Sequence, residues 1–405
     1  MSITQPSSFP GAPTAAAAAG DLPAAPTAGA TASDLRSQPA VGVVGVLVSS
    51  MLCLVLGVLI LPIDSLQILG AVTTFSLPVL IASALWWHGW PARGTSRAAS
   101  GLLNTALIAG LALILTALAQ VIAGRGDLAH LLSTTPAVAG HGPGRPPFPS
   151  FPWTLPLAAL IFLAMIQLTF VCDRRPLRRL GTPGAGIAAI VVSWIVGLVA
   201  YELLADWNAV LPPVAQGALG LSNPGGPVGA FNLLGWTLCV AVWSVVLFIP
   251  LRGRAFAVIG SVPARLLAGN AVTLALGWGM FLLLSGPLGL TVPEIAAGCG
   301  VVSAASLVAA LIFEGWPARR LQATPARDGA LLATIAGFAA VLFIVLKALG
   351  DARTTWPPAD PVYLWMTVCA LNFVAAGSIL WYGVWRRWPV AAPAAPTGPA
   401  AEADR

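Results

Sequence analysis

The sequence predicts an all-α polytopic membrane protein with about ten transmembrane helices arranged as five helical hairpins. Hydrophobic residues make up 58% of the chain and charged residues only 8%, with a mean hydropathy of +0.87. A soluble globular protein carries about 25% charged residues, so this chain cannot cover a water-facing surface. The second observation is a series of ten apolar runs, each near the ~20 residues that cross a bilayer.

The chain is predicted to have three parts. Residues 1–40 and 390–405 are rich in Ala and Pro and lack apolar periodicity, so we expect disordered cytoplasmic tails. The N-terminal part also lacks the basic and apolar regions of a signal peptide. Residues 41–389 are expected to form the transmembrane domain. Its ten spans are 41–62, 66–88, 101–123, 154–172, 185–205, 228–250, 266–284, 290–313, 329–349 and 361–384.

Arginine placement predicts the orientation of the spans. The links after the even-numbered spans, together with the segment after the tenth, contain fourteen arginines: Arg93, Arg97, Arg174, Arg175, Arg178, Arg179, Arg252, Arg254, Arg265, Arg319, Arg320, Arg327, Arg386 and Arg387. The opposite links contain four basic residues, Arg125, Arg145, Lys347 and Arg353. Because basic residues are retained on the cytoplasmic side, we expect these arginine-rich links and both termini in the cytoplasm. The Arg, Ala, Gly and Pro bias is typical of a high-GC bacterium, so the plasma (inner) membrane of a bacterium is the expected location.

A short motif recurs at the ends of the spans. Trp90-Pro91-Ala92-Arg93 and Trp316-Pro317-Ala318-Arg319 are identical, and looser forms follow spans four, six and ten. They divide the membrane domain into five possible hairpin repeats of about 70 residues. Trp favours the membrane interface, Pro ends a helix and Arg meets lipid phosphate. We interpret these residues as interface anchors: Trp90, Arg93, Arg174, Arg175, Arg178, Arg179, Trp316, Arg319, Arg320, Arg386 and Arg387.

Polar residues inside apolar spans are candidates for a ligand site, because each costs free energy in hydrocarbon. Besides Asn104, Gln120, Gln167 and Asn372, the sequence offers five ligand or cation candidates: Glu202, Asp206, Asn232, Asn270 and Glu294.

Each candidate also has a structural interpretation. Glu202 and Asp206 lie one turn apart and could bind a cation, or they could form a solvated helix end. Glu294 either faces a cavity or complements the dipole at a helix N-terminus. Asn270 either binds a ligand or holds helices together.

Motifs for catalysis and metal binding are missing. The chain has no phosphate-binding loop, zinc-protease motif or nucleophile elbow. Its five cysteines form no CxxC pair. His130 and His141 share one outer link and could hold a metal with nearby acids, but their spacing is weak evidence, so we predict no catalytic residue, metal site or cofactor. A non-enzymatic protein is favoured. Since topology accounts for the arginines, the expected partners are the lipid bilayer and an unknown small molecule or protein, without nucleic acid.

The favoured function is a permease or transporter of unknown substrate. Repeated helices rich in Gly and Pro are typical of secondary transporters, which bind substrate near the bilayer midplane. This function predicts a polar central cavity bounded by Glu202, Asn232, Asn270 and Glu294, and an apolar centre would count against it. The alternatives are a non-catalytic membrane scaffold or assembly subunit, and a membrane-embedded enzyme acting on lipid beneath the outer links 124–153 and 206–227.

Overall fold

The structure is a computed structural model that describes residues 38–60, 65–92, 94–123, 131, 151–352 and 362–390. This part of the chain is helical, apart from two-residue strands β1 (Ala205–Asp206) and β2 (Val228–Gly229), which pair in parallel. Eight of the helices described are long and apolar enough to cross a membrane. The all-α class is therefore confirmed, and the helices are compatible with a multi-pass membrane protein. At the expected second and fourth spans the structure has shorter apolar helices, Gly70–Trp86 and Leu155–Val171.

Five of the long helices form an outer layer. They are α1 with its continuation η2 (Ala40–Cys53 and Leu54–Leu59), α4 (Arg97–Ala123), α6 (Thr182–Leu204), α9 (Val262–Ser285) and α11 (Thr324–Asp351). Within their most apolar stretches only 22% to 33% of the residues are buried. Large apolar side chains such as Leu102, Leu203 and Ile344 are more than half exposed. Such faces suit contact with lipid, which is as apolar as leucine.

The other five helices form an inner layer. They are α3 with η4 (Gly70–Ile81 and Ala82–Trp86), α5 with η6 (Leu155–Ile166 and Gln167–Val171), α8 (Ala230–Phe248), α10 with η9 (Val292–Leu307 and Val308–Ile312), and the helix 362–384, composed of α12 (Val362–Val368), η11 (Cys369–Ala375), α13 (Ala376–Ile379) and η12 (Leu380–Val384). In α8 and the last two helices 67% to 83% of the most apolar stretch is buried. These inner helices are therefore largely covered by the rest of the protein.

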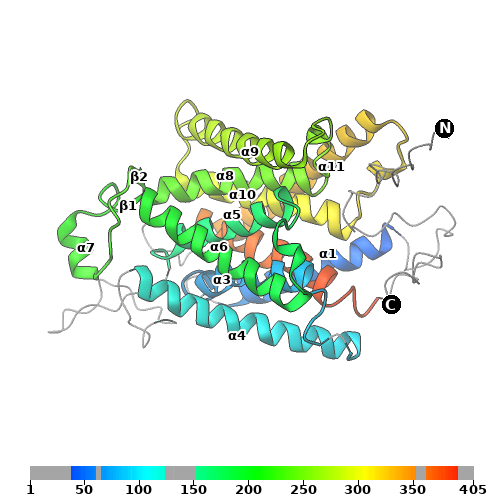
Figure 1. The fold of residues 1–405 in the computed structure, drawn as a ribbon, viewed down its shortest axis with the longest axis horizontal. Coiled ribbons are helices and arrows are strands. Elements are labelled where there is room, and N and C mark those ends of the chain that lie inside the picture. The colour runs from blue at the N-terminus through cyan, green and yellow to red at the C-terminus, as the bar shows by residue number, and fades with distance from the viewer. Residues whose placement is uncertain are drawn as a thin grey trace, which may run out of the picture.

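The inner helices close into a ring in chain order. α3 packs against α5, α5 against α8, α8 against α10 and α10 against α12, and residues 369–384 return to α3 and η4. The long helices run along the long axis of the molecule, with α4 along one edge and α9 along the opposite edge (Figure 1). β1, β2 and the short α7 (Pro213–Leu219) lie at one end of this bundle. The hydrophobic core is the interior of the ring and its contact with the outer layer.

Each outer helix packs most extensively on the inner helix that precedes it across an arginine-rich turn. The pairs are α3 with α4, α5 with α6, α8 with α9, and α10 with α11. This pairing differs from the expected hairpins, in which an outer link joined the two helices of a unit. Connection length does not decide this pairing, since α9 and α10 are joined by only residues 286–291 and yet pack little on each other, whereas the longer segment 313–323 joins α10 and η9 to α11, which packs closely on α10.

The fifth inner helix lacks a following outer helix, and α1 occupies that position. α1 packs on η11, α13, η9 and η12. Its Gly42 and Gly45 lie against Phe313 and Trp381, so closely that neither position has room for a Cβ. The bundle therefore contains five inner–outer units, and the fifth is completed by the first helix of the chain.

The five turns share one backbone conformation. Each contains two consecutive residues with positive φ, at His88–Gly89, Asp173–Arg174, Arg252–Gly253, Glu314–Gly315 and Arg386–Arg387. In each turn the residue after this pair donates a backbone hydrogen bond to the carbonyl three residues earlier, as from Trp90 to Trp87 and from Arg254 to Leu251. The third unit, which has neither Trp nor Pro at this point, keeps the same geometry. The recurring sequence motif thus marks a recurring structural turn.

The turns gather at one end of the bundle, called here the arginine end. Contacts between neighbouring units join them: Arg174 Nη1 donates to Leu85 O at 3.0 Å, and Arg97 Nη1 donates to Val390 O at 2.9 Å. Arg254 pairs with Asp328 at the start of α11. These polar contacts close the ring where the helix ends would otherwise leave carbonyl groups unpaired.

Candidate functional site

A cavity lies inside the inner ring. All five inner helices line it, which places it at the centre of the ring. It has a volume of about 40 Å³ and an almost entirely apolar wall. The lining residues are Thr74, Leu77, Phe151, Leu155, Ala159, Phe162, Leu234, Leu238, Ala296, Leu364, Thr367, Val368, Leu371 and Asn372. No charged side chain is among them.

Asn372 is the most polar group of the cavity. It lies in η11, a π-helical segment in the middle of helix 362–384, and is only 6% exposed. Its Nδ2 donates to Thr74 Oγ1 at 2.8 Å and to Gly70 O at 3.3 Å. Thr74 in turn donates its hydroxyl proton to Gly70 O at 2.6 Å. The carboxamide is therefore held against α3 across the seam between the fifth and first units.

This arrangement leaves hydrogen-bonding capacity at the cavity. The Thr367 hydroxyl donates to Tyr363 O at 2.9 Å, so its oxygen retains lone pairs. Within the described part of the chain, no hydrogen bond to Asn372 Oδ1 is found. π-Helical segments inside α-helices are frequent at functional sites. The cavity is thus an apolar chamber with one carboxamide and two hydroxyl groups.

The five residues expected to bind a ligand do not line this cavity. Glu202 is exposed near the end of α6, and Asn232 is exposed in the first turn of α8. Asn270, on α9, donates to Leu266 O at 2.8 Å and to Cys172 Sγ at 3.4 Å, which matches the structural interpretation of a helix–helix contact. The polar chamber expected between Glu202, Asn232, Asn270 and Glu294 does not coincide with the cavity at the centre of the ring.

The two remaining candidates have local structural roles. Glu294 forms a capping box with Thr291 at the start of α10, accepting from its backbone N–H at 2.8 Å and its hydroxyl at 2.7 Å. Asp206 accepts from Asn208 N at 3.0 Å and from Asn223 Nδ2 at 3.1 Å. Both carboxylates thus satisfy nearby donors in helix-end and loop structure.

The end opposite the turns carries a folded cap. Trp207 is fully buried there and donates its Nε1–H to Tyr201 Oη at 2.9 Å. Its ring packs edge-on against Trp153 and Phe231, with centroid distances of 5.6 and 5.7 Å. The histidines of the expected outer link, His130 and His141, lie outside the described residues. Within the described part, no three His, Cys, Asp or Glu side chains gather closely enough to hold a metal ion.

A second polar cluster lies between three helices inside the bundle. Gln167 Nε2 donates to Ser244 Oγ at 3.2 Å and to Thr273 Oγ1 at 3.1 Å, which joins η6 to α8 and α9. Its Oε1 is buried, and no partner for it is found among the described residues. The cluster is away from the cavity lining, so we interpret it as a contact that fixes the positions of these helices.

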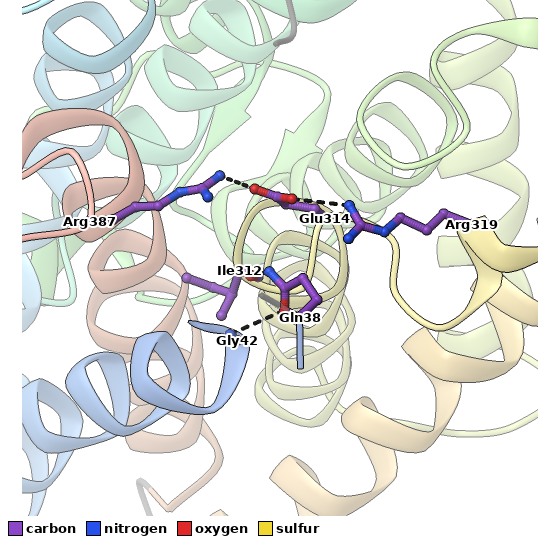
Figure 2. Close-up of polar contacts among 6 residues, drawn as sticks. All are labelled: Gln38, Gly42, Ile312, Glu314, Arg319 and Arg387. Carbon is purple, nitrogen blue, oxygen red and sulfur yellow. Dashed lines mark hydrogen bonds and ion pairs between the residues drawn. The ribbon is translucent and has the colours of Figure 1, made fainter. Parts of the chain in front are cut away.

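Several predicted anchors make contacts within the protein at the arginine end. Glu314 lies between Arg387 and Arg319 and pairs with both, as Figure 2 shows. Gln38, just before α1, donates to Ile312 O at 2.9 Å and accepts from Gly42 N at 3.2 Å beside this cluster (Figure 2). These groups tie the first helix and the last two units together.

The other anchors differ in exposure. Arg175 and Arg178 pair with Asp173 at 3.6 and 3.3 Å, and Arg179 is exposed. The guanidinium of Arg320 lies over the Trp316 ring at 5.8 Å. Trp90 packs edge-on against Trp87. Arg93 lies outside the described residues.

Comparison of the chain with protein-family models, curated proteins and solved structures found no match. The class of the protein therefore comes from its own features: an all-helical bundle with eight helices, among those described, that are long and apolar enough for a membrane.

Sequence reasoning named Asn372 among the polar residues of the spans but left it out of the five ligand candidates. A sequence signal for it does exist, since it falls near the middle of the expected span 361–384, whereas the selected Glu202 and Glu294 lie near span ends. Depth in the membrane raises the cost of a polar group. Its partner Thr74, about 300 residues away in the chain, had no comparable signal.

Proposed function

We propose that this protein is a permease of the bacterial inner membrane that binds and passes a small uncharged molecule through the centre of the five-helix ring. The observation that carries the proposal is the composition of the cavity wall. All five inner helices contribute to it, none with a charged side chain, and Asn372 supplies a carboxamide. Pockets for small molecules typically combine an apolar wall with a few placed polar groups.

The size of the cavity limits the substrate. A water-sized molecule occupies about 10–15 Å³ by this measure, and a dry cavity of about 150 Å³ accepts benzene. A cavity of about 40 Å³ therefore has room for a molecule of two to four heavy atoms. An ion would lose its hydration without a counter-charge in the wall, at a cost of several kcal/mol or more. Uncharged substrates are favoured for this reason.

The proposal includes ten membrane segments with the arginine end in the cytoplasm. The eight long helices and the two shorter inner helices correspond in order to the ten expected spans. A helix of 17 residues is about 25 Å long, close to the ~30 Å hydrocarbon core, and Gly70–Trp86 is preceded directly by η3 (Ser65–Leu69). Arginines gathered at one end favour retention of that end on the cytoplasmic side.

The test is permeability of proteoliposomes measured by stopped-flow light scattering with small solutes such as urea, formamide, glycerol and water. Ala296→Leu adds a branched side chain at a fully buried cavity position, whereas Ala336→Leu makes the same change on the exposed face of α11. We expect Ala296→Leu to abolish at least 90% of the protein-dependent flux of a transported solute, an effect of about 1.4 kcal/mol on the barrier. Ala336→Leu should retain the flux.

Two further variants address selectivity and folding. Leu238→Ala enlarges the cavity and should admit larger solutes, and Asn372→Leu should lower flux of solutes that hydrogen-bond. Folding of each variant is checked by its thermal unfolding midpoint. Equal flux through wild type, Ala296→Leu and Leu238→Ala for every solute, or no flux above empty liposomes, would refute the permease and favour the scaffold alternative.

A further inference from the structure

The cavity at the centre of the ring has few polar groups, and the positions of their hydrogens decide which molecules it can bind. Among its lining residues, Thr74, Thr367 and Asn372 have polar side chains. Each hydroxyl carries one polar hydrogen, and the carboxamide nitrogen carries two. A ligand can accept a hydrogen bond from these side chains only if one of the hydrogens is not already used within the protein.

The carboxamide of Asn372 uses both of its N–H groups within the protein. Its Nδ2 donates to Thr74 Oγ1 at 2.8 Å and to Gly70 O at 3.3 Å. The Gly70 carbonyl fixes this orientation, because a carbonyl accepts hydrogen bonds and cannot donate them. A carboxamide turned the other way would place two oxygen atoms 3.3 Å apart with no hydrogen between them.

Both threonine hydroxyls also donate within the protein. Thr74 Oγ1 donates to Gly70 O at 2.6 Å, and Thr367 Oγ1 donates to Tyr363 O at 2.9 Å. Each acceptor is a carbonyl one helical turn earlier, so these bonds form within a single helix. The polar side chains that line the cavity therefore have their hydrogens engaged, and what they offer a ligand is lone pairs.

Asn372 Oδ1 is the acceptor that borders the cavity. Among the residues that the structure describes, no group donates to it. Asn104 Oδ1 and Gln167 Oε1 also have no donor there, but protein atoms enclose them completely. Asn372 Oδ1 does not share that enclosure. Because Asn372 is only 6% exposed and lines the cavity, the free space beside its oxygen is the cavity itself.

We propose that the cavity selects uncharged molecules that donate hydrogen bonds, with Asn372 Oδ1 as the group that determines this specificity and Thr367 Oγ1 as a second acceptor. The donor-selective site rests on the proposed permease function and narrows its substrate class. Small primary amides and alcohols meet the requirement. Ketones and ethers do not, because their lone pairs would face the lone pairs of the site.

The apolar wall strengthens this preference. The other lining side chains are apolar and supply no donor to a ligand that lacks one. A hydrogen bond in such low-dielectric surroundings is stronger than in water, and an unpaired polar group is correspondingly costly. Sites that hydrogen-bond a ligand group reject an analogue without that group more strongly than an apolar pocket rejects a missing methylene.

Acetamide and acetone test the specificity, because they have the same number of heavy atoms and differ by an amino group against a methyl group. The full-length protein is purified in detergent with nitrogen-15 in its asparagine side chains. The NMR signal of Asn372, identified by its absence in Asn372→Leu, is followed during titration with each solute. We expect a saturable shift with acetamide and at least about tenfold weaker binding of acetone. The signal of Asn270, whose carboxamide donates to Leu266 O and Cys172 Sγ, should stay constant.

A threonine variant checks the second acceptor. Thr367→Val removes the hydroxyl with little change in side-chain size, and it should weaken acetamide binding about threefold or more. The matched control is Thr334→Val on α11, where the hydroxyl donates to Ala330 O at 2.8 Å. This control should bind acetamide as the wild type does. Equal affinity for acetamide and acetone, or no saturable response of the Asn372 signal to acetamide, would overturn the proposed specificity.

The binding measurement is independent of transport. Saturable, acetamide-selective binding without flux into proteoliposomes would refute the permease and support the donor-selective site. Flux through the wild-type protein combined with equal binding of acetamide and acetone would overturn the donor selectivity, while the permease proposal would stand.

Discussion

The contact between α8 and α9 allows a sharp test of the inner–outer packing. Gly277 of α9 is buried, and a Cβ added there would lie 2.7 Å from the backbone N and Cα of Val240. Gly279 lies two residues further along the same helix and is exposed, and a Cβ added there would have no other atom within 4 Å. We predict that Gly277→Ala destabilises the bundle and that Gly279→Ala does not.

The magnitude follows from the required displacement. Backbone atoms cannot rotate away, so α9 must retreat by at least about 0.7 Å to reach the ordinary contact distance of 3.4 Å. A gap of 0.5–1 Å between two packed helices removes a quarter to a half of the van der Waals attraction between their facing atoms. Overpacking of this kind lowers the stability of the folded state by about 1–3 kcal/mol. Replacing Gly by Ala returns about 1 kcal/mol of helix propensity at both positions. That gain cancels in the comparison, so we expect Gly277→Ala to be less stable than Gly279→Ala by about 2 kcal/mol.

Fluorescence reports directly on this contact. Trp278 of α9 packs edge-on against Trp236 of α8 with ring centroids 5.9 Å apart. Reversible unfolding in mixed micelles, followed by tryptophan emission, gives the free energy of each variant. If Gly277→Ala were as stable as Gly279→Ala, the close approach of α8 and α9 would be wrong, and with it the inner–outer arrangement of the third unit.

Three further measurements address other contacts. Gln167→Leu should change the free energy of unfolding by no more than about 1 kcal/mol. The hydroxyls of Ser244 and Thr273 keep their own carbonyl acceptors, and interhelical hydrogen bonds in membranes average about 0.6 kcal/mol. A decrease in the free energy of unfolding above about 3 kcal/mol would contradict this expectation. Arg387→Gln should lower the free energy of unfolding by about 1–2 kcal/mol, because Glu314 is left with Arg319 alone. Adding Glu314→Gln should restore part of this stability, as measured in the same unfolding assay. Reporter fusions after residues 95, 180, 258 and 322 should be located in the cytoplasm, and a fusion after residue 215 should be located outside. A cytoplasmic location of the fusion after residue 215 would contradict the proposed ten-segment topology.

The sequence predicted the turns well because a membrane interface restricts residue types. Trp90 and Trp316 are followed by proline and arginine, residue types that favour the end of a membrane span. The third turn shows the limit of this reasoning. Arg252 and Gly253 belong to only a looser form of the motif, which lacks Trp, yet they share the backbone of the other turns. What the turns have in common is left-handed φ at two consecutive positions, which residue type alone does not reveal.

The two layers could not be predicted, for a physical reason. Lipid and protein interior are both apolar, so the exposed Leu102 and the buried Leu157 are equivalent in any hydropathy pattern. The division depends on which helices meet in the ring, through contacts between distant segments. The same holds for the site. Glu202 and Glu294 stood out because they are charged, whereas the cavity is formed by apolar residues around Asn372.

The cavity depends on closure of the ring between the first and fifth units. The cavity wall includes Thr74 of the first unit and Asn372 of the fifth, so it exists only when these two units meet. α1 and its continuation η2 hold the fifth unit from outside, because Trp365 Nε1 donates to Gly57 O at 2.8 Å. Gln38, just before α1, donates to Ile312 O of the neighbouring fourth unit at 2.9 Å. These bonds join residues 274 or more positions apart in the chain. The first helix therefore completes the last unit, and the chamber at the centre depends on contacts between the first and last helices of the bundle.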